Sequence, residues 1–161
     1  MGVHDVKIEV VLLSVSDHAQ LRWRVVSGDL PTGGQPDTEA RALAGLGATV
    51  PPATVVHSTS WRPTPDGLIL TYAVLPDPNP DLPDDAVRAV PTDARIVCST
   101  DAAAPTPAAV DVEHVLAHAL RHLSLVARTD PAVVAAVATH PQLWDAVLAR
   151  TPDVAGQFVC S

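Results

Sequence analysis

Three histidines recur at every fourth position in the stretch HVLAHALRH, as His114, His118 and His122. On an α-helix such residues share one face, and two neighbours could bind a metal ion as the histidine pair of HExxH does. One ion could not reach all three, because two helical turns separate the outer pair by about 12 Å. No glutamate follows His114, as the HExxH pattern would require.

The apolar residues of the same stretch indicate which way this histidine row points. They form one stripe, and the histidines fall on the opposite half of the helix, with His122 nearest the apolar edge. The stripe consists of Leu116, Leu120, Leu123 and Ala127, flanked by Val115, Ala119 and Val126. We interpret the row as a solvated or partner-facing surface. The alternative is a metal-responsive or pH-responsive site, since imidazole gains charge near pH 6.5.

A second group of chemically capable side chains lies in VVHSTSWRP. If this segment is a strand, His57, Thr59 and Trp61 share one face, and Arg62 follows at its end. Arg24, on an earlier strand, could approach the same side. An imidazole, an indole and guanidinium groups would suit an anionic or nucleotide ligand, so these residues are our candidate ligand pocket. The alternative is an ordinary sheet face on which the tryptophan packs against a helix.

Nucleophilic catalysis has no local signature in the chain. No serine stands in GxSxG, and a strand would place the neighbours of HSTS on opposite faces. The two cysteines, Cys98 and Cys160, form no CxxC, which predicts two reduced thiols in a cytoplasmic protein. We therefore predict no catalytic residue, no metal site and no cofactor.

The stretch DLPTGGQPDTEARALAGLGAT, residues 29–49, runs from a Gly/Pro loop into a short helix. It lacks the lysine of a GxxxxGK[ST] phosphate loop and the spacing of GxGxxG. Its setting, two strands before LPTGG and a hairpin after the helix, resembles the Nudix hydrolase family over about residues 5–76. That resemblance implies a Nudix-like scaffold, on which the family's glutamates hold the Mg²⁺ that activates diphosphate hydrolysis.

The chain departs from the family pattern at the residues that bind this metal. With either Gly45 or Gly47 as the closing glycine, the paired glutamates are replaced by Ala42 and Leu43, or by Ala44 and Gly45. Glu39 is the only glutamate nearby. Oxygen ligands are what Mg²⁺ requires, so the resemblance implies the scaffold without its chemistry.

The remaining pattern predicts an α+β fold with a mixed sheet of about five strands packed against helices. Alternating or continuous apolar runs predict strands at 6–16, 21–27, 53–61, 68–75 and 94–99. Helical periodicity and capping residues predict helices at 36–46, 111–128, 131–139 and 141–150, and residues 76–89 read as a proline-broken loop that ends in a short helix. We divide the chain into a core at 1–100, a linker at 101–110 and a helical segment at 111–161.

The helical segment carries an apolar set that must be covered, either by the sheet or by a second copy in a homodimer. These interface candidates are Leu143, Trp144, Val147 and Leu148. The net charge of −8 disfavours nucleic acid as a partner. No apolar run is long enough to span a membrane, and residues 1–10 do not resemble a secretory signal. The richness in Ala, Val, Pro and Asp is typical of proteins from GC-rich bacteria.

Three functions fit these patterns. We favour a non-catalytic module that binds an unidentified small molecule or another protein on a Nudix-like scaffold. The first alternative is a metal-dependent hydrolase of a nucleoside-diphosphate-type substrate, with ligands drawn from Asp37, Glu39 or Asp84. The second alternative is a metal- or pH-responsive accessory protein that uses the histidine row.

Overall fold

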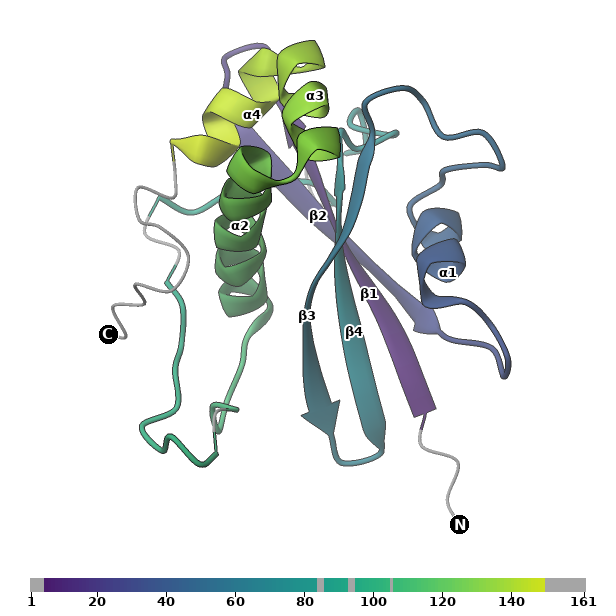
Figure 1. The fold of residues 1–161 in the computed structure, drawn as a ribbon, viewed down its shortest axis with the longest axis vertical. Coiled ribbons are helices and arrows are strands. Elements are labelled where there is room, and N and C mark those ends of the chain that lie inside the picture. Colours follow the sequence, from purple (N-terminus) through teal and green to yellow (C-terminus); the bar gives the residue numbers. More distant parts are fainter. Residues whose placement is uncertain (1–4, 84–85, 93–94, 105, 150–161) are drawn as a thin grey trace.

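The computed structural model describes residues 5–83, 86–92, 95–104 and 106–149. In chain order its elements are β1 (Asp5–Val15), β2 (Leu21–Asp29), α1 (Pro36–Leu43), β3 (Val55–Thr64), β4 (Gly67–Leu75), β5 (Arg88–Ala89), α2 (Val112–Thr129), α3 (Pro131–Thr139) and α4 (Pro141–Leu148). The sheet lies between α1 on one face and α2 to α4 on the other (Figure 1). This arrangement confirms the predicted α+β class with a mixed five-stranded sheet.

The sheet has the strand order β3-β4-β1-β2-β5. Two hairpins, β1–β2 and β3–β4, supply four of its strands, as the sequence predicts. The chain crosses one face through α1, so the second hairpin joins the first with β4 parallel to β1. Gly67 begins β4 against the backbone of Asp5, and an added Cβ would meet the Asp5 carbonyl oxygen at 1.8 Å. Only glycine fits this close approach.

β1 is a central strand that is covered on both faces. Ile8, Val10 and Leu12 point into the cluster beneath α1, whereas Val11 and Leu13 point into the cluster beneath α2 to α4. All five are fully buried, which explains why residues 10–13 form a continuous apolar run, whereas polar residues alternate with apolar ones earlier in the strand.

α1 begins at Pro36 and ends before Gly45, which has φ of +79°. The Gly45 and Leu46 amides bond back to the carbonyls of Ala42 and Arg41 at 3.0 and 2.9 Å, as in a glycine-terminated helix. The helix therefore ends earlier than the predicted residue 46. Ala40, Ala44 and Leu46 cover the sheet.

The three C-terminal helices complete the larger core cluster with the sheet. The predicted apolar stripe of α2 is buried there, led by Leu116, Leu120 and Leu123. Of the interface candidates, Leu143, Trp144 and Val147 are also buried in this cluster, and Leu148 is half-buried. They pack on the sheet, which was one of the two expected outcomes. The predicted homodimer was to be formed by these same residues, so they no longer support it.

Two predictions for the segment after β4 are wrong. Residues 95–99 are not a strand; the fifth strand is Arg88–Ala89, paired with β2. Here the Arg88 guanidinium lies 4.4 Å from the centre of the Trp23 ring, and Pro91 removes the donor that a longer strand would need. The described residues of 76–89 also contain no helix, because prolines recur every two or three residues from Pro76 to Pro83.

None of the helices in the described part of the chain is both long and apolar enough to cross a membrane.

Two of the three tryptophans, one buried and one exposed, allow a direct test of the core. Trp144 has 0% exposure and Trp61 has 64%. We expect Trp144→Ala to lower the free energy of unfolding by about 3–5 kcal/mol, because it leaves a cavity between α4 and the sheet. Trp61→Ala should change it by less than about 1 kcal/mol. Urea unfolding of both variants measures the difference, and equal losses would contradict this packing.

Candidate functional site

The four residues of the predicted ligand pocket do not meet in one place. Arg24 is held by Asp77, with Nε–Oδ2 and Nη2–Oδ1 distances of 2.6 and 2.7 Å. The two side chains are 10% and 1% exposed. The backbone N–H of Asp77 also donates to the Leu13 carbonyl at 2.7 Å. Arg24 therefore fixes the chain that leaves β4 and is not available to a ligand.

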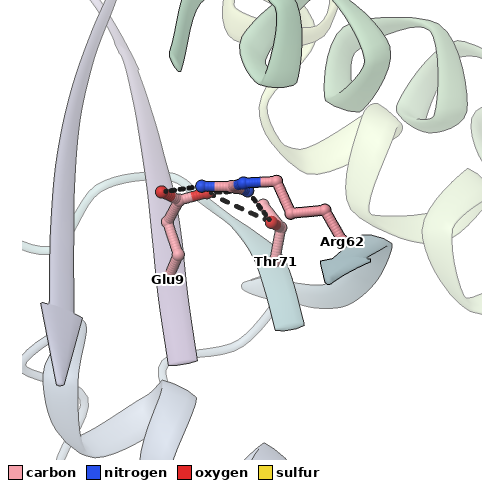
Figure 2. Close-up of polar contacts among 3 residues, drawn as sticks. All are labelled: Glu9, Arg62 and Thr71. Carbon is pink, nitrogen blue, oxygen red and sulfur yellow. Dashed lines mark hydrogen bonds and ion pairs between the residues drawn. The ribbon is translucent and has the colours of Figure 1, made fainter. Parts of the chain in front are cut away.

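Arg62 is bound to Glu9 by a second bidentate ion pair that crosses the sheet from β3 to β1 (Figure 2). Both Nη–Oε distances are 2.9 Å. The hydroxyl of Thr71, on the intervening strand β4, accepts from Arg62 at 3.3 Å and donates to Glu9 at 3.1 Å. The two charges cancel locally. Both bonds to Glu9 use the Nη atoms, which leaves the Arg62 Nε–H outside the pair.

A β-bulge separates His57 from Trp61, contrary to the prediction that they share one face. The register of β3 shifts between Ser58 and Ser60, with Thr59 as the extra residue. As a result His57 lies opposite Ala73, whose side chain faces α2, and Trp61 lies opposite Leu70, which packs in the cluster on the α1 side. One inserted residue reverses the alternation that the sequence pattern assumed.

A cavity of about 470 Å³ lies between the end of β3, the start of α2 and the segment 96–110. This volume is within the range of small-molecule sites in proteins. The lining residues are Ser60, Trp61, Arg62, Ile96, Val97, Cys98, Ser99, Asp101, Ala102, Thr106, Pro107, Val110, His114, Val115 and His118. The cavity thus joins two predicted pocket residues to two members of the histidine row. The row faces this cavity and β3 and is only partly exposed, so its interpretation as a solvated surface needs correction.

The sequence gives little indication of the third wall of this cavity. Residues 94–99 have the β-branched composition of a strand, and residues 101–110 have the composition of a linker. In the structure Ile96 and Val97 instead line the cavity opposite α2. The apolar character of residues 96 and 97 was the one signal in the sequence that this segment packs over other residues.

The polar lining of the cavity combines N–H donors with hydroxyl groups and the carboxylate of Asp101. His114 Nδ1 accepts from the backbone N–H of Asp111 at 3.1 Å. A backbone amide can only donate, so the neutral His114 ring carries its proton on Nε2. Arg62 contributes its remaining N–H groups, and Ser60 and His118 lie beside it. In contrast, the Asp101 carboxylate already accepts from the Ala103 amide at 2.8 Å.

The third histidine of the row contacts β3 directly. His122 Nε2 lies 3.1 Å from His57 Nδ1, and the ring centroids are 4.8 Å apart. Burial lowers the pKa of His122 below its ordinary value of 6.5, and the neighbouring His57 and His118 lower it further. This pair lies one helical turn from His118 and therefore close to the cavity.

A second cavity of about 460 Å³ lies between α1 and β3, where the Nudix resemblance would place metal chemistry. Asp37 lines it but accepts a hydrogen bond from the Tyr72 hydroxyl at 2.5 Å. Glu39 does not line it. Asp84, the third suggested ligand, lies outside the described residues. Within the ranges that the structure describes, no three His, Cys, Asp or Glu side chains are grouped so that they could hold a metal ion.

Cys98 is disulfide-bonded, so the prediction of a reduced thiol at this position is wrong. The other cysteine, Cys160, lies outside the described residues. Disulfides persist mainly in oxidising compartments. The reduced thiol at Cys98 therefore no longer supports the prediction of a cytoplasmic location.

We compared the chain with protein-family models, with curated proteins and with solved structures, and none of them matches it.

The ion pair of Figure 2 gives a test of how strongly the site depends on it. We expect Glu9→Gln to lower the free energy of unfolding by about 3 kcal/mol, because a largely buried guanidinium loses its counter-charge. The matched control is Asp29→Asn in the exposed pair with Lys7, whose atoms are 4.0 Å apart. It should change stability by less than about 0.5 kcal/mol. If denaturant midpoints show equal effects, the Glu9 pair is no more than a surface contact.

Tyr72 is the single tyrosine of the chain, so its titration can be followed by ultraviolet absorbance. Burial raises the pKa of Tyr72 from 10.0 to about 12, and the hydrogen bond and charge of Asp37 contribute. We expect Asp37→Asn to move this pKa toward 10. A pKa raised on folding means that the pair adds stability below pH 10, which is lost as pH rises through 12. A tyrosine that titrates near 10 in the folded wild type would contradict the contact.

Proposed function

We propose that this protein is a non-catalytic binding module for a small, largely apolar molecule that carries carboxylate or carbonyl oxygens. The observation that carries the proposal is the composition of the cavity between β3 and α2. Its walls are largely aliphatic, from Ile96, Val97 and Val115, and its polar side chains include the N–H donors Arg62 and His114. Such a combination favours an apolar body with acceptor oxygens at one end.

The charges around the cavity support a ligand with at most one negative charge. The Arg62 charge is offset by Glu9, so the remaining N–H groups act as oriented donors more than as a net positive field. His114 adds a donor whose position is fixed by its Nδ1 contact. A nucleoside diphosphate, with several phosphate charges, would find no comparable compensation in these residues.

Trp61 supports a ligand that contains a planar group. Trp61 lines the cavity from the edge strand β3 and is 64% exposed, although burial of an indole is normally favourable. A planar ligand that stacks on it would bury this surface. Exposed aromatic residues at the edge of a cavity are typical of binding sites.

The hydrogen bonds of the cavity support binding rather than catalysis. In the part of the chain that the structure describes, neither the His114 ring nor the His118 ring is bonded to a hydroxyl or a carboxylate. A nucleophile activated by a base, with a third group that orients the base, is therefore missing from these contacts. The Nudix-like scaffold remains part of the proposal, and the order of β1, β2, α1, β3 and β4 supports it.

The test compares two ligands with the same skeleton, 4-phenylbutyrate and 4-phenylbutylamine. A cavity with Arg62 and His114 as donors should bind the carboxylate at least about tenfold more tightly than the ammonium, which can only donate. Isothermal titration calorimetry measures both. Equal affinities, or no saturable binding of either compound, would overturn the proposal.

Variants then locate the binding site. We expect Trp61→Ala to weaken 4-phenylbutyrate binding at least about fivefold, because stacking is lost. The matched control is Val134→Ala on α3, which removes the other large exposed hydrophobic side chain among the described residues and does not line the cavity. If both variants bind as the wild type does, the ligand is not in this cavity.

A further inference from the structure

Two imidazole rings join the edge strand of the sheet to the longest helix. His57 projects from β3 and His122 from α2, and their Nδ1 and Nε2 atoms are 3.1 Å apart. Their rings are inclined by 55°. At this distance one nitrogen must donate and the other must accept, because two lone pairs or two N–H groups would repel each other.

The surroundings of His57 determine which ring donates. His57 Nδ1 also lies 3.0 Å from the carbonyl oxygen of Ser58, which can only accept. A proton on His57 Nδ1 therefore satisfies both neighbours, through a shared hydrogen bond to Ser58 O and His122 Nε2. His122 Nε2 is then the acceptor, and the neutral His122 ring carries its proton on Nδ1.

Protonation of His122 turns this attraction into repulsion. The added proton on Nε2 would point at the N–H of His57, and the hydrogen bond would be replaced by two opposed donors. His122 is half-buried, so the new charge would also lack solvent.

Few ionisable groups near the pair could compensate such a charge. The side chains that act on His122 are His57 from β3 and His118 from its own helix, and neither can supply a negative charge. α3 contains no ionisable side chain, and α4 contributes only Asp145, which is exposed. Glu9 of β1 is already bound to Arg62, and β4 contributes only Tyr72, on the α1 side of the sheet. The residue His57 also borders the cavity at α1, where Asp37 and Arg41 carry opposite charges.

We propose that the His57–His122 hydrogen bond is a proton-operated latch that holds α2 against β3, and that acidification below about pH 6.5 opens the ligand cavity. The link to the cavity rests on the proposed function. His118, which lines the cavity, lies one turn before His122 on α2, and Trp61 lies four residues after His57 on β3. Separation of the two elements would therefore move two walls of the cavity apart.

The direction of the effect follows from the proton balance. The pKa of His122 is lowered in the folded state, chiefly by burial and then by His57 and His118. Folding stability from this group is therefore complete above pH 6.5 and is lost as pH falls through the lower folded-state pKa. A latch that opens on acidification agrees with this sign.

Hydrogen exchange measured by mass spectrometry tests the latch without any ligand. After correction for the intrinsic pH dependence of exchange, wild-type protection in β3 and α2 should fall several-fold between pH 7.5 and 5.5, because one histidine can contribute up to about tenfold. In His122→Gln, whose amide oxygen still accepts from His57 but does not titrate, most of this fall should disappear. His18→Gln, at an exposed histidine in the β1–β2 turn, is the matched control and should behave as the wild type. No fall in the wild type, or the same fall in His122→Gln, would overturn the proposal.

Histidine-ring NMR on the unmodified protein covers the case in which His122→Gln does not fold. At pH 7.5 the ¹⁵N shifts should show His57 Nδ1 protonated and His122 Nε2 unprotonated. An unprotonated His57 Nδ1 would overturn the proposal.

Binding of 4-phenylbutyrate at the two pH values then tests the link to the cavity. We expect several-fold weaker binding at pH 5.5 for the wild type, up to about tenfold, and a smaller loss for His122→Gln. If this compound fails to bind at either pH, the proposed function fails, whereas the exchange and NMR results still decide the latch. If it binds equally at both pH values, the latch does not control the cavity.

Discussion

The Arg62–Glu9 ion pair is the contact that sets the geometry of β3 and of everything built on it. Removing two charges from water is costly, and the cost is offset only when both partners and their hydrogen bonds are in place. Here the pair spans three strands, with the Thr71 hydroxyl between the charged groups. It ties the edge strand to the centre of the sheet at one position. The bulge at Thr59 lies between Arg62 and His57. The contact of Arg62 with β1 and the contact of His57 with α2 therefore both depend on the register of β3 against β4.

This constraint explains why the cavity and the histidine contact lie together. Arg62 is directed toward β1, the exposed Trp61 lines the cavity from β3, and His57 contacts α2. The same helix then supplies His114 and His118 to the cavity and His122 to the sheet. The proposed binding site and its proposed pH control therefore use the same face of α2 and the same strand, β3. The binding site uses the turns of His114 and His118, and the pH control uses the turn of His122.

Apolar periodicity predicted most of the fold, because it reflects which face of a helix or strand is buried and is repeated over many residues. The two hairpins, α1 and the three C-terminal helices follow from apolar periodicity and from capping residues such as Asp130 and Gly45. The site could not be predicted in the same way. A single bulge residue, Thr59, reverses the alternation of β3, and no composition signal marks it. Arg24 and Arg62 looked available for a ligand because their partners, Asp77 and Glu9, lie far away in sequence.

The parallel pairing of β1 with β4 has a consequence for how the chain reaches this structure. Asp5 is paired with Gly67 and Leu12 with Val74, so the central strand obtains its second neighbour only after both hairpins and α1 are complete. Contacts between such distant segments slow folding, since a long loop must close before they form. Until then β1 presents an unpaired edge that includes the apolar run 10–13, which is the kind of surface that recruits strands from other chains. The period before β4 docks is therefore when this protein is most exposed to aggregation.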